Sequence, residues 1–147
     1  MNNKYRHLLD EVTAIIDHRL PLVSNLANIS ALLYSLEDVN WAGFYLSNKE
    51  YLYLGPFQGE VACTKIPFDK GVCGAAYSQK KTIIVDNVNE FKGHIACSSK
   101  SKSEIVTPII KDNNVMGVID IDSPIYSRFS LEEQELLEEI AHVISKL

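Results

Sequence analysis

The spacing of the apolar residues changes near residue 39, and this change constrains the fold more than any other feature. Over residues 5–19 and 22–36 side chains that are apolar, apart from Arg19, recur at helical spacing, with Pro21 between the two stretches. Over residues 39–46 the period becomes two, so alternate side chains share a face: Ala42, Phe44 and Leu46 on one, Trp41, Gly43 and Tyr45 on the other. Two helices followed by a sheet are therefore predicted.

The rest of the chain continues the sheet and closes with a helix. Strands are predicted over residues 51–54, 63–68, 82–85, 104–110 and 115–121, with Gly55-Pro56 ending the first of them, and a short helix over 72–79. Residues 86–102 form a long polar loop, a feature that is usually functional or disordered. Ser130 and Glu133 form the capping box of a last helix. The predicted fold class is α+β, as one domain over residues 1–147.

Composition narrows the classes of partner and compartment. The 19 acidic and 14 basic residues give a net charge of −5, and the basic residues are scattered, which argues against nucleic acid and anionic membranes as partners. No apolar run reaches the roughly 18 residues of a membrane helix. Residues 1–12 are charged throughout and do not resemble a signal peptide, so a cytoplasmic protein is expected. Three cysteines, an odd number, favour reduced thiols over a structural disulfide framework.

Two carboxylates stand out in the strand over residues 115–121 and just beyond it. Asp120 and Asp122 are two residues apart, so both side chains point to one face, with their Cα atoms roughly 7 Å apart. Glu104 opens the neighbouring strand and can reach the same region. If that face is solvated, the carboxylates are only the polar side of an amphipathic strand. If it lines a cleft, repulsion between the like charges raises at least one pKa and allows proton donation.

Trp41 and Tyr45 share one face of their strand, where aromatic residues usually belong to the core. Beside carboxylates they can also form a small cage, with flat apolar walls for a methyl group and acids for a cation.

The three cysteines occupy different contexts. Cys97 lies in the polar loop, where a thiol is accessible, whereas Cys63 and Cys73 occupy positions typical of small buried hydrophobes. A zinc site would need His94 with all three cysteines, yet only His94 and Cys97 approach the usual ligand spacing, so no metal is expected. A Cys-His protease would lack a residue to orient the histidine. Thiol redox chemistry on a small, cationic, methyl-bearing substrate fits these residues together.

Several motifs then carry a specific resemblance to a known family. In order they are Asn40-Trp41-x-Gly43-Phe44-Tyr45, Leu54-Gly55-Pro56-Phe57-Gln58-Gly59, Ala62-Cys63, Ile66-Pro67, Gly71-Val72-Cys73-Gly74, Gly93-His94-Ile95-Ala96-Cys97, Ser103-Glu104-Ile105-Val106 and Gly117-Val118-Ile119-Asp120-Ile121-Asp122-Ser123-Pro124. Over nearly its whole length the chain resembles the free methionine-(R)-sulfoxide reductases, which are enzymes of the GAF fold. The resemblance implies a mostly antiparallel sheet of about six strands, with the N-terminal and C-terminal helices on one face.

The resemblance also assigns roles to individual residues. It implies that Cys97 is the nucleophile, Cys63 the principal resolving thiol, and Cys73 an alternate or relay thiol. It implies an acidic substrate pocket of Glu104, Asp120 and Asp122, with Trp41 and Tyr45 as the aromatic wall at the methylthio end. Ser98 and Val61 depart from the family pattern, where Asp and Pro are common.

The implied activity is reduction of free L-methionine-(R)-S-oxide, which is part of the defence against oxidative stress. No bound cofactor is implied; thioredoxin is the external reductant, with NADPH consumed upstream. Related domains often pair through their helices, so a homodimer is one expectation. The alternative is a non-catalytic GAF module that senses a small ligand or the redox state.

Overall fold

The structure, a computed structural model, describes residues 1–94 and 100–147. Its centre is a six-stranded sheet in the order β3-β2-β1-β6-β5-β4, in which every neighbouring pair is antiparallel. The elements are α1 (Asn3–Ile15), α2 (Leu22–Tyr34), β1 (Trp41–Ser47), β2 (Tyr51–Gly59), β3 (Lys65–Pro67), α3 (Gly71–Gln79), β4 (Ile83–Val85), the short 3-10 helix η1 (Val88–Glu90), β5 (Ser103–Lys111), β6 (Asn114–Ser123) and α4 (Leu131–Ile144).

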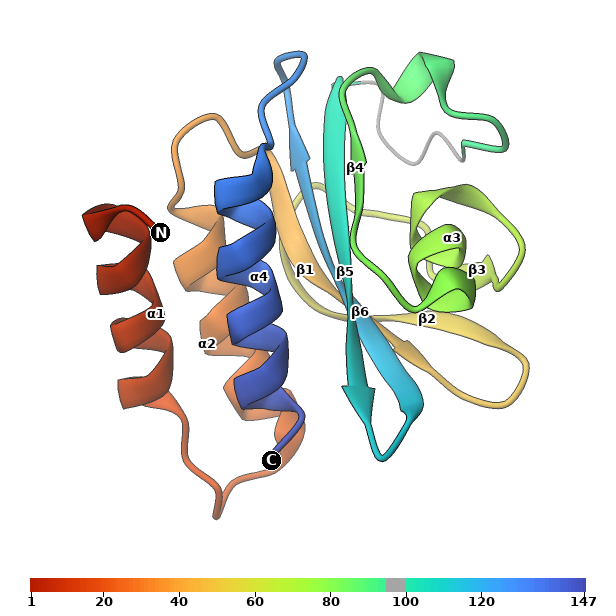
Figure 1. Ribbon diagram of the computed structural model, residues 1–147. Coiled ribbons are helices and arrows are strands. Elements are labelled where there is room, and N and C mark those ends of the chain that lie inside the picture. The colour runs from red at the N-terminus through yellow and green to blue at the C-terminus, as the bar shows by residue number, and fades with distance from the viewer. Residues whose placement is uncertain (95–99) are drawn as a thin grey trace.

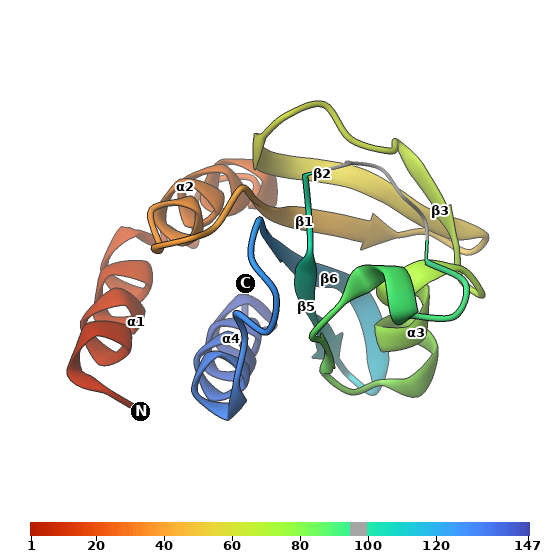
Figure 2. The same ribbon diagram turned by 90° about the horizontal axis from the view of Figure 1, so that it is seen from above.

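The helices are divided between the two faces of the sheet (Figure 1). On one face α2 packs against β1 and β2, and α4 packs against β5, while α1 lies outside them against both helices. Seen from above, α3 lies on the opposite face, where it contacts β3, β5 and β6 (Figure 2). The predicted α+β architecture is confirmed. Among the described residues, no helix is both long enough and apolar enough to cross a membrane.

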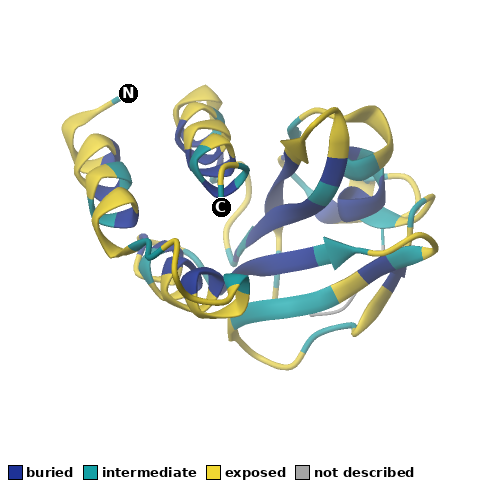
Figure 3. Ribbon diagram, turned by 90° about the horizontal axis from the view of Figure 1, so that it is seen from below, coloured by how far each residue is buried: buried dark blue, intermediate teal, exposed yellow. Residues whose placement is uncertain are grey.

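The alternation along β1 places its side chains in two separate apolar clusters. Ala42 and Phe44 belong to the cluster between the sheet and α1, α2 and α4, together with Ile119 and Ile121 of β6. Trp41 and Tyr45 belong to the cluster on the other face, with Val106 and Val118. Buried residues accordingly line the strands and the inner faces of the helices (Figure 3). The predicted assignment of the two strand faces is confirmed.

The prediction that Gly55-Pro56 ends the return strand is wrong. β2 continues to Gly59, because these two residues lie opposite Phe44 alone and form a bulge between the pairs Gly43↔Phe57 and Tyr45↔Leu54. A proline is tolerated there because β3 pairs only with residues 51–53, which leaves this edge of β2 outside the ladder.

The first helix ends at Ile15 and does not reach residue 19 as predicted. Its continuation is prevented by the buried side-chain amide of Asn25, which accepts a hydrogen bond from the backbone N–H of Asp17 at 2.9 Å and donates to its carbonyl at 3.0 Å. A side chain of the next helix, α2, thus satisfies backbone groups that another turn of α1 would have used.

The predicted capping box of α4 is present and extends into a network that joins α1 to α4. Glu133 accepts hydrogen bonds from the Ser130 backbone N–H at 2.5 Å and from the buried Tyr5 hydroxyl, and its carboxylate lies 3.4 Å from the Arg128 guanidinium. Although burial opposes ionisation, the hydrogen bonds from Tyr5 and Ser130 leave the pKa of Glu133 below its ordinary value.

Replacing Glu133 with alanine is therefore expected to lower the free energy of unfolding by about 2 kcal/mol at pH 7, because the Glu133 half of the capping box and the buried ion pair are both lost. Glu133→Gln keeps the cap and should cost less. Since the folded-state pKa is lowered, the charge contributes stability above pH 4.5 that disappears as the pH falls through the folded-state value. Urea unfolding from pH 7 to pH 3 would measure this, with the exposed Glu139→Gln as control. A constant difference between wild type and Glu133→Gln across this range would contradict the prediction.

Candidate functional site

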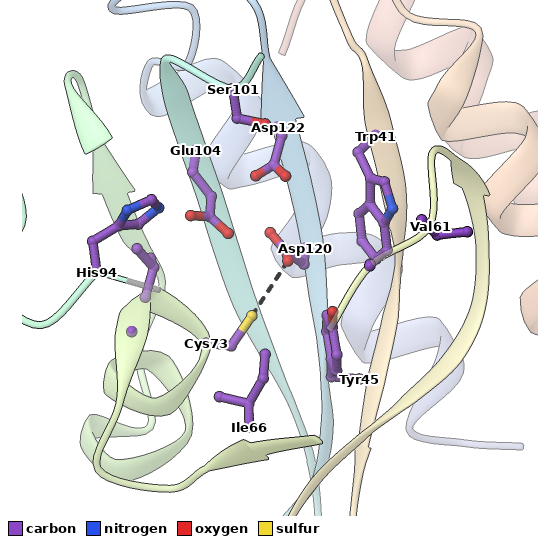
Figure 4. A pocket seen from close by; sticks show the side chains of 13 residues that line it. Trp41, Tyr45, Val61, Ile66, Cys73, His94, Ser101, Glu104, Asp120 and Asp122 are labelled. Atoms are coloured by element: carbon purple, nitrogen blue, oxygen red, sulfur yellow. Dashed lines mark hydrogen bonds between the residues drawn. The ribbon is translucent and has the colours of Figure 1, made fainter. Parts of the chain in front are cut away.

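A small cavity of about 50 Å³ lies on the α3 side of the sheet. Strands β1, β5 and β6 form its floor, the first turn of α3 forms one wall, and the segment after β2 forms another (Figure 4). It is lined by Trp41, Tyr45, Val61, Ala62, Ile66, Gly71, Val72, Cys73, His94, Ser101, Glu104, Asp120 and Asp122. Seven of the eight residues singled out from the sequence fall in or beside this cavity; the eighth, Cys97, lies outside the described residues.

Strand register brings the three acids, hereafter the acid triad, to one point. Glu104 on β5 pairs directly with Asp122 on β6, and Asp120 lies two residues further along the same face. Glu104 and Asp120 are 7 % and 5 % exposed, and Asp122 is partly buried. The solvated alternative for this strand face is therefore wrong, because α3 and the loops cover it.

Burial dominates the electrostatics of the acid triad. Loss of hydration, followed by the charges of the two aspartates, raises the pKa of Glu104 well above its ordinary value. Burial and the charge of Asp120 do the same to the pKa of Asp122. Burial also raises the pKa of Asp120, but hydrogen bonds from Glu104 and Cys73 oppose that rise. The three groups lie close enough to titrate as one cluster, and Asp120 is the member whose ionised form the neighbouring hydrogen bonds favour most.

The two predicted aromatic residues, Trp41 and Tyr45, form the wall of the cavity that faces the acid triad. Trp41 and Tyr45 stack with their ring centroids 5.9 Å apart, and Phe57 stacks on the other side of Trp41 at 5.1 Å. Each also has a polar contact: Trp41 Nε1 donates to the Glu60 carbonyl at 3.1 Å, and the Tyr45 hydroxyl donates to the Cys63 carbonyl at 2.8 Å. The aromatic wall thus holds the backbone that carries Cys63.

The cysteines differ in state as well as in position. Cys63 is disulfide-bonded, so the thiols are not all reduced as the cysteine count suggested. Cys73 is a free thiol, buried in the first turn of α3, and its Sγ donates to Asp120 Oδ2 at 3.3 Å.

Of the residues that a zinc site would need, His94 and Cys73 line the cavity, Cys63 is disulfide-bonded, and Cys97 lies outside the described residues. Cys63 in a disulfide has no thiolate to offer a metal. Among residues 1–94 and 100–147, the metal-capable group is instead Cys73 with Glu104 and Asp120, whose ligand atoms lie within 4.8 Å of one another. This set coincides with the buried acids of the cavity.

Sequence reasoning did not place His94 or Ser101 in the pocket. Burial lowers the pKa of His94, and the charge of Asp120 opposes that effect, so the imidazole faces the acid triad (Figure 4). Ser101 lines the triad's end of the cavity. Beside them, Lys100 reaches across to the Glu60 carboxylate at 2.5 Å. A polar loop offers no periodicity from which such inward-facing residues can be recognised.

Comparisons with known proteins agree with this architecture. A family model described as the GAF domain matches residues 21–146. The free methionine-R-sulfoxide reductase of Saccharomyces cerevisiae is 49% identical, with 95% of this chain and 82% of the relative covered, and that of Escherichia coli is 42% identical, with 97% and 87% covered.

A solved structure, the free methionine-R-sulfoxide reductase of Neisseria meningitidis in complex with its substrate, superposes with a TM-score of 0.94 at 39% identity, covering 99% of this chain and 90% of that one. The class defined by fold and site is therefore the GAF-domain proteins, and within that class the chain belongs to the family of the free methionine-R-sulfoxide reductases.

Proposed function

We propose that this protein reduces free L-methionine-(R)-S-oxide to L-methionine, with Cys97 as nucleophile, Cys63 as resolving thiol and thioredoxin as the external reductant. The observation that carries the proposal is the convergence of three acids, two buried and one partly buried, and a stacked aromatic wall on one small cavity. Relatives named for this activity at 42% and 49% identity support it.

The cavity matches the chemical parts of the substrate. The ammonium group of the substrate pairs with the ionised member of the acid triad, and the methylthio end of the substrate packs against Trp41 and Tyr45. A peptide-bound methionine sulfoxide has no ammonium, so it would leave a buried carboxylate unpaired, at a cost of roughly 1–3 kcal/mol. The site therefore favours the free amino acid.

The acid triad also activates the sulfoxide. A protonated carboxylic acid donates a hydrogen bond to the sulfoxide oxygen, which makes the sulfur electrophilic. The Cys97 thiol attacks the sulfoxide sulfur. The oxygen is transferred to the Cys97 sulfur, which becomes a sulfenic acid, and the substrate, reduced by two electrons, leaves as methionine. The Cys63 thiol then condenses with the sulfenic acid, forming a disulfide and one water. A thioredoxin dithiol reduces the disulfide by exchange and is itself oxidised.

The direct test is a coupled assay with thioredoxin, thioredoxin reductase and NADPH on racemic free methionine sulfoxide. NADPH oxidation is expected to stop when half of the racemate is consumed, and N-acetylmethionine sulfoxide should react far more slowly. Binding of the free sulfoxide without any NADPH oxidation would instead identify a sensing module.

Tyr45 gives a separate prediction about the resolving step. Tyr45→Phe removes the hydrogen bond to the Cys63 carbonyl, which is worth about 1 kcal/mol, and should slow disulfide formation about five-fold. The sulfenic acid should then persist longer and be trapped more completely by a dimedone-type reagent, as quenched-flow mass spectrometry would measure. Tyr53→Phe, at an exposed position on β2, is the matched control. Equal trapping of the sulfenic acid in wild type and Tyr45→Phe would show that the Tyr45 hydroxyl does not anchor Cys63 for the resolving step.

Two expectations about the whole protein stay predictions. Pairing of two copies into a homodimer is checked by sedimentation, and a cytoplasmic location by fractionation of cells that express the protein.

A further inference from the structure

The thiol of Cys73 has no step in the proposed reaction, although it lines the cavity. It is 3% exposed, and its Sγ contacts Asp120 Oδ2 at 3.3 Å, the contact drawn as a dashed line in Figure 4. Figure 4 also shows the Asp120 carboxylate between this thiol and Asp122, with the Glu104 carboxylate to one side. Among the residues that the structure describes, the other oxygen, Asp120 Oδ1, is buried without a hydrogen-bond partner, as is Asp122 Oδ1. A buried carboxylate oxygen with no donor is costly unless a ligand supplies one.

The surroundings of Cys73 make it a poor redox thiol. Burial, followed by the charges of Asp120 and Glu104, raises the pKa of the Cys73 thiol well above its ordinary value. Since the thiolate is the attacking species in disulfide exchange, a thiol held in this state reacts slowly. The disulfide of the structure also engages Cys63 and leaves Cys73 free. A protonated thiol is still a hydrogen-bond donor, and a carboxylate is the acceptor that suits it best.

The donor is held firmly by its helix. Cys73 lies in the first turn of α3, which is anchored by a hydrogen bond from the Gly71 N–H to the Gly93 carbonyl at 3.0 Å. The next residue, Gly74, packs so closely that a Cβ would lie 2.8 Å from the Phe68 carbonyl oxygen. The start of α3 therefore has little freedom to move away from Asp120.

We propose that Cys73 is a positioning residue, whose S–H holds Asp120 Oδ2 so that Oδ1 faces the cavity as the acceptor for the substrate ammonium. This inference rests on the proposed function and deepens it. It replaces the alternate or relay role with a hydrogen-bonding one and divides the acid triad: Asp120 binds the cation, while Glu104 and Asp122 keep the protons.

The experiment compares Cys73→Ala, which removes the donor, with Cys73→Ser, which keeps a hydroxyl donor of similar size. Binding of free methionine sulfoxide and of N-acetylmethionine sulfoxide is measured by calorimetry in a Cys97→Ser background, where no turnover interferes. Cys73→Ala should weaken binding of the free sulfoxide about five-fold, the effect of one lost hydrogen bond, and leave the N-acetyl compound unchanged. Preference for the free amino acid should fall by the same factor, and Cys73→Ser should restore most of it. In the full enzyme the same change should appear in KM more than in kcat.

A purely structural role for Cys73 would weaken both ligands equally, and that result would overturn the proposal. The proposal would also be overturned if the Cys73→Ser enzyme stopped after one round of turnover, because that result would make Cys73 a redox thiol. The two proposals can fail separately. If wild type binds the free sulfoxide and oxidises no NADPH, the reductase activity fails while the calorimetric comparison still decides the role of Cys73. If wild type binds neither ligand, both proposals are wrong.

Discussion

Cys97→Ser is expected to abolish turnover of free methionine sulfoxide, and Cys63→Ser is expected to complete a single round per protein molecule and then stop. The reason is that the two thiols act in successive steps: one takes the oxygen from the substrate, and the other converts the sulfenic acid into a disulfide that a dithiol can reduce. Measuring methionine released per protein in the presence of thioredoxin separates the two variants.

Unfolding curves recorded under reducing conditions are the control, because they show whether either serine variant has lost its fold. Sustained multiple turnover by Cys97→Ser would refute its assignment as nucleophile. Sustained turnover by Cys63→Ser would show that another thiol can resolve the intermediate.

Glu104→Gln should lower kcat/KM by at least about 100-fold, the lower end of what general acid catalysis contributes. The same change should stabilise the protein at neutral and alkaline pH. Burial and the neighbouring aspartates raise the pKa of Glu104, so the folded state holds a proton that the unfolded state releases. The free energy of unfolding of the wild type therefore falls as the pH rises from 4.5, the ordinary pKa of Glu104, to its raised value in the folded state.

Glu104→Gln removes this dependence. At pH 8 the variant should be more stable by about 1 kcal/mol or more, since one pKa unit corresponds to about 1.4 kcal/mol, and at pH 4 the difference should vanish. Urea unfolding between pH 4 and pH 8 measures the effect, with the exposed Glu139→Gln as control. If the variant were less stable than wild type at pH 8, ionisation of the buried Glu104 carboxyl would not be what destabilises the folded state. A gain in stability with loss of activity is the trade-off expected of a functional site.

Local patterns predicted most of the fold correctly. The change of period before β1, the alternation on β1 and β6, and the capping box of α4 each depend on neighbouring residues, and each is present. The errors lie where a group from a neighbouring element intervenes. Asn25 ends α1 by bonding both backbone groups of Asp17, and the pairing of β2 with β1 carries β2 through Gly55-Pro56 as a bulge.

The same division holds for the site. Period two alone places Asp120 and Asp122 on one face, and the hairpin between β5 and β6 makes Glu104 their neighbour. Whether that face is exposed to solvent or buried depends on which segments cover it, and residue spacing does not predict which segments those are. His94 reaches the acids from a loop without periodicity, and sequence reasoning missed it for that reason.

What the sequence by itself determined is the inventory: which residues form strands and helices, and which carboxylates, aromatics and thiols can meet on one side of the sheet. Only the tertiary structure decided that Glu104 and Asp120 are buried, that Cys63 is in a disulfide, and that Cys73, 47 positions from Asp120, donates to its carboxylate. The physical reason is that pKa, hydration and hydrogen bonding depend on the atoms that surround a group in space, and long-range packing supplies those atoms.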